Sequence, residues 1–212
     1  MKRLILITLS VIFSCSCIAQ QGKERRLFVP TFEVVAGPRF AVYPKEEVLA
    51  KSLLMYQTGA LFGVEMGQSH GATFLNAGAF LENYRYTRGE VQHITASFVD
   101  FPIHFGYRYC FSDRFSASAS AGLNFVYCYH YRSNGFEIVG KDMDFSHVMG
   151  ASADLSAEYA LSDQFSLCAS VLTNFYFQQT LWVKYDYNYS SIEFPTFINV
   201  LLGVKYRPRF LQ

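Results

Sequence analysis

The sequence is poor in charge and has no long apolar run in its mature part. Only 17% of the 212 residues are charged, whereas a water-soluble domain usually carries about a quarter. The formal charge of +1 at pH 7 lacks the basic excess of nucleic-acid-binding proteins, so we expect no nucleic-acid partner. Beyond the first twenty residues, no segment offers about 18 continuously apolar residues, which excludes a membrane-spanning helix.

The first twenty residues read as a secretory signal. A basic pair at residues 2–3 precedes the apolar core Leu4–Phe13, and small residues then lead to a cleavage site after Ala19. We therefore expect residues 1–19 to be removed and residues 20–212 to form one domain. That mature chain keeps 16 basic and 17 acidic residues, a charge of −1.

Cysteine is scarce as well. Three cysteines remain after cleavage, Cys110, Cys128 and Cys168, and an odd number allows at most one disulfide. Their positions on strands suggest small side chains that fill an interior, so we expect free thiols. A lipid-modified Cys15 or Cys17 is an alternative to ordinary cleavage, although neither follows the usual lipoprotein pattern.

Aromatic residues are abundant, with 15 Tyr and 21 Phe, and they recur at every second position. In Phe115–Tyr131 the odd positions read Phe, Ala, Ala, Ala, Leu, Phe, Tyr, Tyr, Tyr, and the even positions read Ser, Ser, Ser, Gly, Asn, Val, Cys, His. This alternation predicts a β-strand with one apolar and one polar face. Seven further segments show the period, the first and third less regularly: Thr31–Tyr43, Leu54–Met66, Thr73–Tyr86, Phe101–Phe111, His147–Leu161, Gln164–Val183 and Phe194–Tyr206. Pro38 predicts a local irregularity in the first.

One short unit, Tyr-x-x-Ser-Asp-x-Phe-Ser, occurs at Tyr109–Ser116 and again at Tyr159–Ser166. The Ser-Asp pair predicts a tight turn, because short polar side chains bond their own backbone. Together with "GQSHG" (Gly67–Gly71), these short turns alternate with longer polar connectors. The longer connectors are Pro44–Ser52, Arg85–His93, Arg132–Ser146 and Val183–Glu193. The alternation predicts eight strands joined by short turns on one side and long loops on the other.

The two faces of the strands suit a barrel that is apolar outside and polar inside. Aromatic residues gather at both strand ends, Phe115 and Phe165 at one and Phe125, Tyr127, Tyr129 and Tyr131 at the other, like the girdles of outer-membrane barrels. In lipid, only a closed barrel satisfies every backbone group of a β-structure. The polar faces collect six acids and four bases: Glu33, Arg39, Glu65, Glu82, Asp100, Arg108, Asp154, Glu158, Lys205 and Arg207.

The sequence therefore predicts an all-β fold, an eight-stranded antiparallel up-and-down transmembrane β-barrel in the outer membrane, with both termini in the periplasm. Eight strands enclose just enough space for side chains, so we expect a monomer without a wide aqueous pore. A soluble lipocalin-like carrier, with its apolar faces inward, is the alternative fold.

The segment Phe98–Phe125, "FVDFPIHFGYRYCFSDRFSASASAGLNF", resembles the signature of Bacteroidetes outer-membrane β-barrel proteins of the PorT-like group. The C-terminal strand also resembles a barrel-assembly signal that ends in Tyr206 or Phe210. This resemblance implies an outer-membrane location and contact with the barrel-assembly machinery, and it allows an accessory role in protein secretion. The residues that carry the resemblance are Asp100, Pro102, Tyr107, Arg108, Tyr109, Ser112, Asp113 and Gly122.

The sequence singles out no catalytic, cofactor-binding or metal-binding residue, and we expect no cofactor. His93, His130 and His147 should lie near the outer mouth, but they lack the carboxylate or thiol partner of a defined metal site. His104 and Asp100 share a face about 13 Å apart along one strand, too far for a catalytic dyad.

The expected role is non-enzymatic: a scaffold, adhesion or secretion-accessory module that presents its outer loops to an extracellular or secretion-system protein. Trp182 and the loop Lys184–Ser191 suggest an interface anchor followed by an exposed loop that binds a partner or only joins strands. The alternatives are an outer-membrane enzyme (a lipid or peptide hydrolase or an acyltransferase), a narrow channel, and the soluble carrier.

Overall fold

The computed structural model describes residues 27–42, 55–68, 71–88, 92–133, 136–139, 147–177, 180–185 and 188–208. The signal segment 1–19, its two cysteines, and the C-terminal residues from 209 onward lie outside the described residues. The described residues include no helix with the length and hydrophobicity needed to cross a bilayer.

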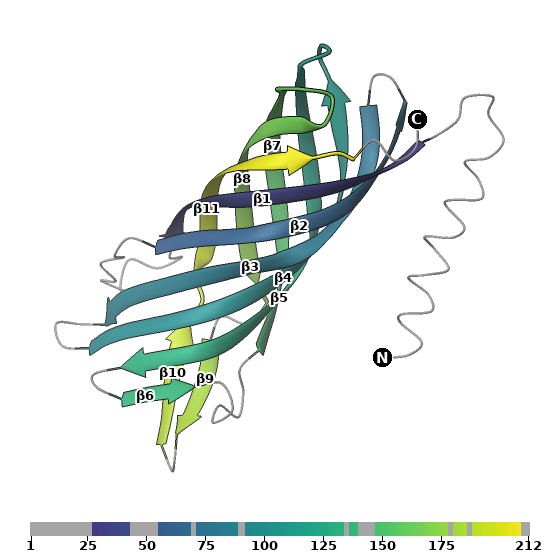
Figure 1. Ribbon diagram of the computed structural model, residues 1–212. Coiled ribbons are helices and arrows are strands. Elements are labelled where there is room, and N and C mark those ends of the chain that lie inside the picture. Colours follow the sequence, from purple (N-terminus) through teal and green to yellow (C-terminus); the bar gives the residue numbers. More distant parts are fainter. Residues whose placement is uncertain are drawn as a thin grey trace, which may run out of the picture.

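Eight antiparallel strands close into a barrel (Figure 1), and the predicted fold class is confirmed. Their order around the wall is β4-β3-β2-β1-β11-β8-β7-β5, and pairing of β4 with β5 closes the ring. Each of these strands pairs only with antiparallel neighbours. The eight are β1 Leu27–Val42, β2 Met55–Gln68, β3 Gly71–Arg88, β4 Gln92–Cys110, β5 Phe115–Ser133, β7 His147–Ala160, β8 Phe165–Tyr176 and β11 Thr196–Tyr206.

Three short strands lie within segments that we expected to be loops or, for part of β9, the end of the preceding strand. β6 (Phe136–Val139) pairs with the part of β5 that extends beyond β7, and β9 (Thr180–Tyr185) pairs with β10 (Asn188–Glu193) in a separate hairpin. An extended strand edge such as that of β5 offers unpaired backbone groups to any nearby segment. Because these segments are polar, the sequence did not predict that they pair.

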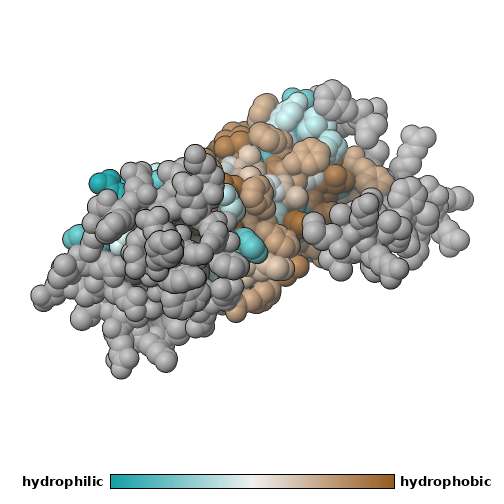
Figure 2. All heavy atoms as spheres, turned by 90° about the horizontal axis from the view of Figure 1, so that it is seen from below, coloured by the Kyte–Doolittle hydropathy of each residue, from teal (hydrophilic) through white to brown (hydrophobic). Residues whose placement is uncertain are grey.

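The two faces of the wall have the predicted polarity. Large apolar side chains on the outer face are exposed, with Phe105 at 63%, Leu155 at 65% and Leu202 at 67%. Figure 2 shows hydrophobic residues across the middle of the visible face. The charged side chains assigned to the inner face are buried or half-buried, so the inward-apolar arrangement of a lipocalin-like carrier is not what the chain adopts.

Tyr131 corrects the expected outer aromatic band. We assigned it to the outer face, but its side chain is only 1% exposed and lies in the lumen. The pairing of β4 with β5 shifts register here, from Phe98↔Cys128 to Ser97↔His130, so Tyr129 is left without a partner. A β-bulge of this kind reverses the alternation of the residues beyond it.

Phe194 is a second correction. The alternation placed it on the apolar outer face with Val200, yet it is 5% exposed and belongs to the apolar interior. β11 begins only at Thr196, so Phe194 stands before the regular strand, where the parity of the strand does not apply.

Pro38 marks the predicted irregularity in β1. The register between β1 and β11 runs to Ala36↔Leu202 and resumes at Arg39↔Asn199, so Gly37 and Pro38 have no partners on β11. Proline has no N–H to donate to the ladder. The chain also approaches β11 closely here, since a Cβ on Gly37 would lie 1.9 Å from the carbonyl oxygen of Val200.

The repeated unit forms two equivalent turns, as predicted. The hydroxyl oxygen of Ser112 accepts from the backbone N–H of Phe115 at 3.1 Å, and that of Ser162 accepts from Phe165 at 3.1 Å. Each turn also bonds the next strand of the wall, because Arg114 O accepts from Ala160 N and Gln164 O accepts from Arg207 N, both at 2.8 Å. The repeat therefore fixes the short-turn end of neighbouring hairpins.

Val200→Arg tests the facing of the wall. Val200 is 41% exposed on the outer face near the middle of β11, and an arginine near the bilayer midplane of a barrel costs about 2 to 4 kcal/mol. We expect unfolding of the protein in lipid vesicles to show a loss of this size, while the control Val200→Leu leaves stability nearly unchanged. Equal stability of Val200→Arg and the parent would contradict the assigned facing.

Candidate functional site

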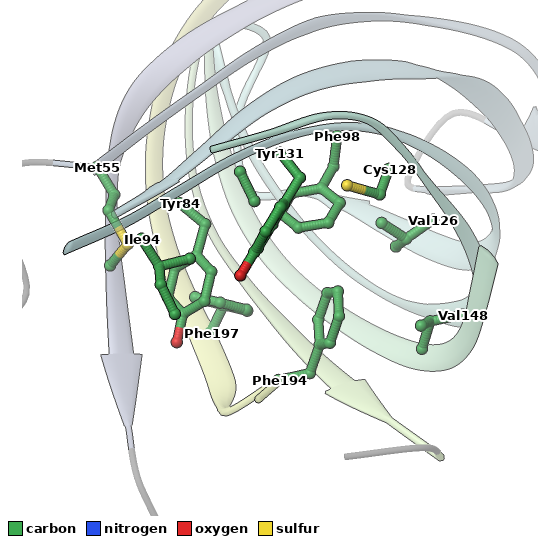
Figure 3. Packing of buried hydrophobic residues seen from close by; sticks show 11 residues of the cluster. Met55, Tyr84, Ile94, Phe98, Val126, Cys128, Tyr131, Val148, Phe194 and Phe197 are labelled. Carbon is green, nitrogen blue, oxygen red and sulfur yellow. The ribbon is translucent and has the colours of Figure 1, made fainter. Parts of the chain in front are cut away.

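The lumen is the most distinctive part of the structure, and side chains fill it at several levels. At the long-loop end lies a buried apolar cluster drawn from most of the barrel strands (Figure 3). Its rings pack edge to face, with centroids 5.3 Å apart for Tyr84 and Phe197 and 5.2 Å apart for Phe98 and Phe194. The apolar cluster consists of Met55, Tyr84, Ile94, Ala96, Phe98, Val126, Cys128, Tyr131, Val148, Phe194 and Phe197.

A polar layer adjoins the apolar cluster, and Arg39 joins the two. Its guanidinium carbon lies 3.6 Å from the ring centroid of Phe197, a cation–π contact. The same group forms an ion pair with Glu82 and donates to the hydroxyl of Tyr176 at 3.0 Å. Gln57 Nε2 also donates to Glu82 at 2.9 Å.

Asp100 belongs to the same layer, where its carboxyl group lies within hydrogen-bond reach of Glu82 and accepts from two amides. Asn124 Nδ2 and Asn174 Nδ2 both donate to Asp100 Oδ2, at 3.5 and 3.4 Å. We call Arg39, Gln57, Glu82, Asp100, Asn124, Asn174 and Tyr176 the amide–carboxylate layer.

Near the short-turn end, three cations and three carboxylates form an ion network. Lys205 Nζ lies 3.1 Å from Glu33 Oε2 and 2.6 Å from Glu158 Oε1. Arg207 bridges Glu158 and Glu65 at 2.5 and 3.1 Å. Arg108 completes the network at 2.8 Å from Glu65.

Of the ten predicted lumen charges, six form this ion network, and Arg39 and Glu82 form a separate ion pair. Buried ions are tolerated only when they are paired, and nearly all of these are. Asp100 and Asp154 are the two inner carboxylates for which the described part of the chain shows no ion pair.

Between these levels lies a cavity of about 20 Å³. Its polar lining includes Asn76, His104, Asp154 and Lys205, together with several serine hydroxyls. A polar space of this size accommodates about one water molecule, and it is far smaller than the pockets that hold substrates, which measure about 300 to 1,000 Å³.

His104 contacts a serine side chain inside the lumen. Its Nε2 lies 2.6 Å from Ser152 Oγ, and both residues are 3% exposed. The sequence did not reveal this pair, because Ser152 is 48 residues away and on β7, two strands from β4. As expected, Asp100 does not orient His104, since Asp100 contacts the amides of the neighbouring layer. A nucleophile also needs an oriented base and access for a substrate, and this buried pair has no such access.

The rim histidines lie where the sequence placed them. His93 and His147 are exposed, and His130 and His147 lie on the paired strands β5 and β7. Within the described ranges, no group of three His, Cys, Asp or Glu residues is arranged to hold a metal ion. The three cysteines of the mature chain are free thiols, as predicted.

Trp182 and residues 184–191 fall in the β9–β10 hairpin, where Lys184 pairs with Tyr189. The side chains of this hairpin lie outside the described residues, so their role as an anchor and a binding loop stays a prediction.

Comparison with solved structures identifies a similar fold. A major outer membrane protein from Thermus thermophilus matches with a TM-score of 0.56 at 13% sequence identity, over 85% of this chain and 99% of that one. Ail, the attachment invasion locus protein of Yersinia pestis, matches with a TM-score of 0.49 at 10% identity, over 85% and 97%. Neisserial surface protein A gives 0.46 at 8% identity, over 85% and 97%. At these identities the likeness concerns the fold alone.

No protein-family model matches the sequence, and no curated protein is similar to it in sequence. Membership of the PorT-like group therefore stays a proposal.

Lys205→Met tests the ion network. The substitution keeps the aliphatic stem but leaves Glu33 without its cation and removes one of two cations from Glu158. Breaking a buried pair from one side costs about 3 to 5 kcal/mol, so we expect a loss of this order in urea unfolding of the refolded barrel.

Two controls calibrate that loss. Arg108→Ala should cost less, because Glu65 keeps Arg207, and Arg114→Met on an exposed turn should cost nothing measurable. Parental stability of Lys205→Met would rule out a stabilising role for the network.

Proposed function

We propose that this protein is an integral outer-membrane protein that acts through the loops it carries at the cell surface, as a scaffold or adhesion module. The observation that carries this proposal is the contrast between its two faces. The lumen is filled by buried side chains at the apolar cluster, the amide–carboxylate layer and the ion network, while the outer face is apolar. Such a wall suits lipid, and such a lumen leaves little for transport or catalysis.

The lengths of the strands support loops that stand clear of the membrane. β4 and β5 have 19 residues each, whereas about 9 to 11 residues cross a bilayer. The excess lies at the long-loop end, because the tight turns follow directly after Cys110 and Ala160. In outer-membrane barrels short turns face the periplasm and long loops face outward. By this reasoning both termini are periplasmic, since β1 begins and β11 ends at the short-turn side.

An accessory role in protein secretion is the second candidate, supported by the resemblance of Phe98–Phe125 to the PorT-like group. Two of the residues that carry this resemblance have roles within the barrel itself, which weakens the support for a secretion role. Arg108 binds Glu65 in the ion network, and Ser112 closes a turn. These are framework roles. They support shared architecture, while an extracellular or secretion-system protein remains the proposed partner and a monomer the proposed state.

A planar-bilayer recording tests the proposal against a channel. The refolded protein should insert without discrete conductance steps, because the apolar cluster and the ion network fill the lumen at two levels. Reproducible single-channel steps that disappear on heat unfolding would contradict a role carried by the loops alone.

Cysteine labelling of whole cells tests the orientation. In a background with Cys110, Cys128 and Cys168 replaced by serine, Ser191→Cys in the β9–β10 hairpin should react with a membrane-impermeant maleimide. Asp113→Cys in the β4–β5 turn should react only after the outer membrane is permeabilised. Labelling of Asp113→Cys in intact cells would reverse the proposed orientation.

A further inference from the structure

The amide–carboxylate layer carries one negative charge more than it can neutralise. Glu82 and Asp100 supply two carboxylates, and Arg39 is the cation of the layer. They lie close together, because Glu82 pairs with Phe98 and Asp100 is two residues further on the same inner face of β4. Diagonal neighbours of this kind stand about 7 to 8 Å apart at their Cα atoms. Arg39 forms its ion pair with Glu82 and also acts on Asp100, so one cation serves two carboxyl groups.

Asp100 is also poorly solvated by the protein. It is 1% exposed, its two hydrogen bonds from amides are long and fall on the same oxygen, Oδ2, and within the described part of the chain no donor reaches its Oδ1. Neutral amide donors contribute no charge, and burying an ionised carboxylate without a counter-charge is costly. The carboxylate therefore calls for a proton or for a positive partner in addition to Arg39.

The amide–carboxylate layer around Asp100 is rich in oxygen, and it also holds an unpartnered donor, Arg39 Nε, among the described residues. Asn124 Oδ1, Asn174 Oδ1 and Gln57 Oε1 are buried and have no hydrogen-bond partner, and all three residues are 0% exposed. The carboxamides of Asn124 and Asn174 both point at Asp100, since their Nδ2 atoms bind its Oδ2. A half-turn of either amide exchanges its nitrogen and oxygen positions with little change in shape.

From this arrangement we infer that Asp100, Asn124 and Asn174 form a buried site for a hard monovalent cation, sodium or potassium. With both amides turned, three oxygen groups from β4, β5 and β8 surround one position. Carboxylate and amide oxygens are the ligands that hard cations prefer. A single positive charge makes the layer neutral, whereas a divalent ion would leave it positive.

The two other ways to satisfy the layer fit less well. A proton shared between Asp100 and Glu82 removes the excess charge but leaves the amide oxygens without a donor or a cation. A water molecule supplies donors but leaves the charge. A monovalent cation neutralises the excess charge and also binds the amide oxygens. At the long-loop end, the apolar cluster screens the site from water, beginning at Phe197, which packs on Arg39.

Thermal unfolding in different salts tests this site. The parent, Asp100→Asn and Asp154→Asn are each refolded and melted in NaCl, KCl, CaCl₂ or choline chloride at one pH and one ionic strength. The parent should melt about 3 to 6 °C higher in NaCl or KCl than in choline chloride, at a salt concentration about ten times the dissociation constant. Asp100→Asn has nearly the same shape without the charge, and it should melt at the same temperature in all four salts. Asp154→Asn is the matched control, a second inner carboxylate without an ion pair that lies outside the layer, and it should keep the parental response.

Three results would overturn the inference. These are a parent that melts alike in sodium, potassium and choline, an Asp100→Asn variant that keeps the parental response, and a response to calcium alone. If Asp100→Asn does not refold, crystals of the parent grown in RbCl decide the question. Anomalous density beside Asp100, between the two asparagines, supports the site, and its absence refutes it.

Discussion

The structure depends on one constraint, that every backbone N–H and C=O in the wall needs a partner within the wall. Hydrocarbon offers none, so the sheet must close, and pairing of β4 with β5 closes it. Closure with eight strands then fixes the width of the barrel. At Gly37 and Pro38 the ladder between β1 and β11 loses partners, and a Cβ on Gly37 would lie 1.9 Å from the carbonyl oxygen of Val200.

A narrow closed wall determines what the lumen contains. Inner side chains from strands that are not direct neighbours meet, so groups far apart in sequence become partners, as Arg207 and Glu65 do. Charges buried there need counter-charges, and aromatic rings supply bulk at the long-loop end. The ion network fills the lumen near the short-turn end of the barrel, and the apolar cluster fills it at the long-loop end. A lumen of this kind favours function at the loops, which is why we place the proposed activity there.

Much of the fold could be predicted from the alternation of apolar and polar residues and from the turn residues. Strict alternation along β4, β7 and most of β5 predicted their two faces, and the Ser-Asp repeat predicted two turns that the structure confirms. The prediction failed where alternation is interrupted by something outside the segment itself. The bulge opposite Ser97 turned Tyr131 inward, and the late start of β11 left Phe194 in the lumen. The short strands β6, β9 and β10 form by pairing with a neighbouring strand, and no local sequence pattern predicts that pairing.

The sequence by itself determined the number of barrel strands, their apolar and polar faces, and the ten charges destined for one interior, because side-chain period and turn chemistry are local properties. Only the tertiary structure decided which charges pair, that Ser152 meets His104, and that Asp100 is left among amides without a cation. Several of those contacts join strands that are not neighbours in the sheet. They depend on register, bulges and the diameter of the closed ring, which are properties of all eight strands together.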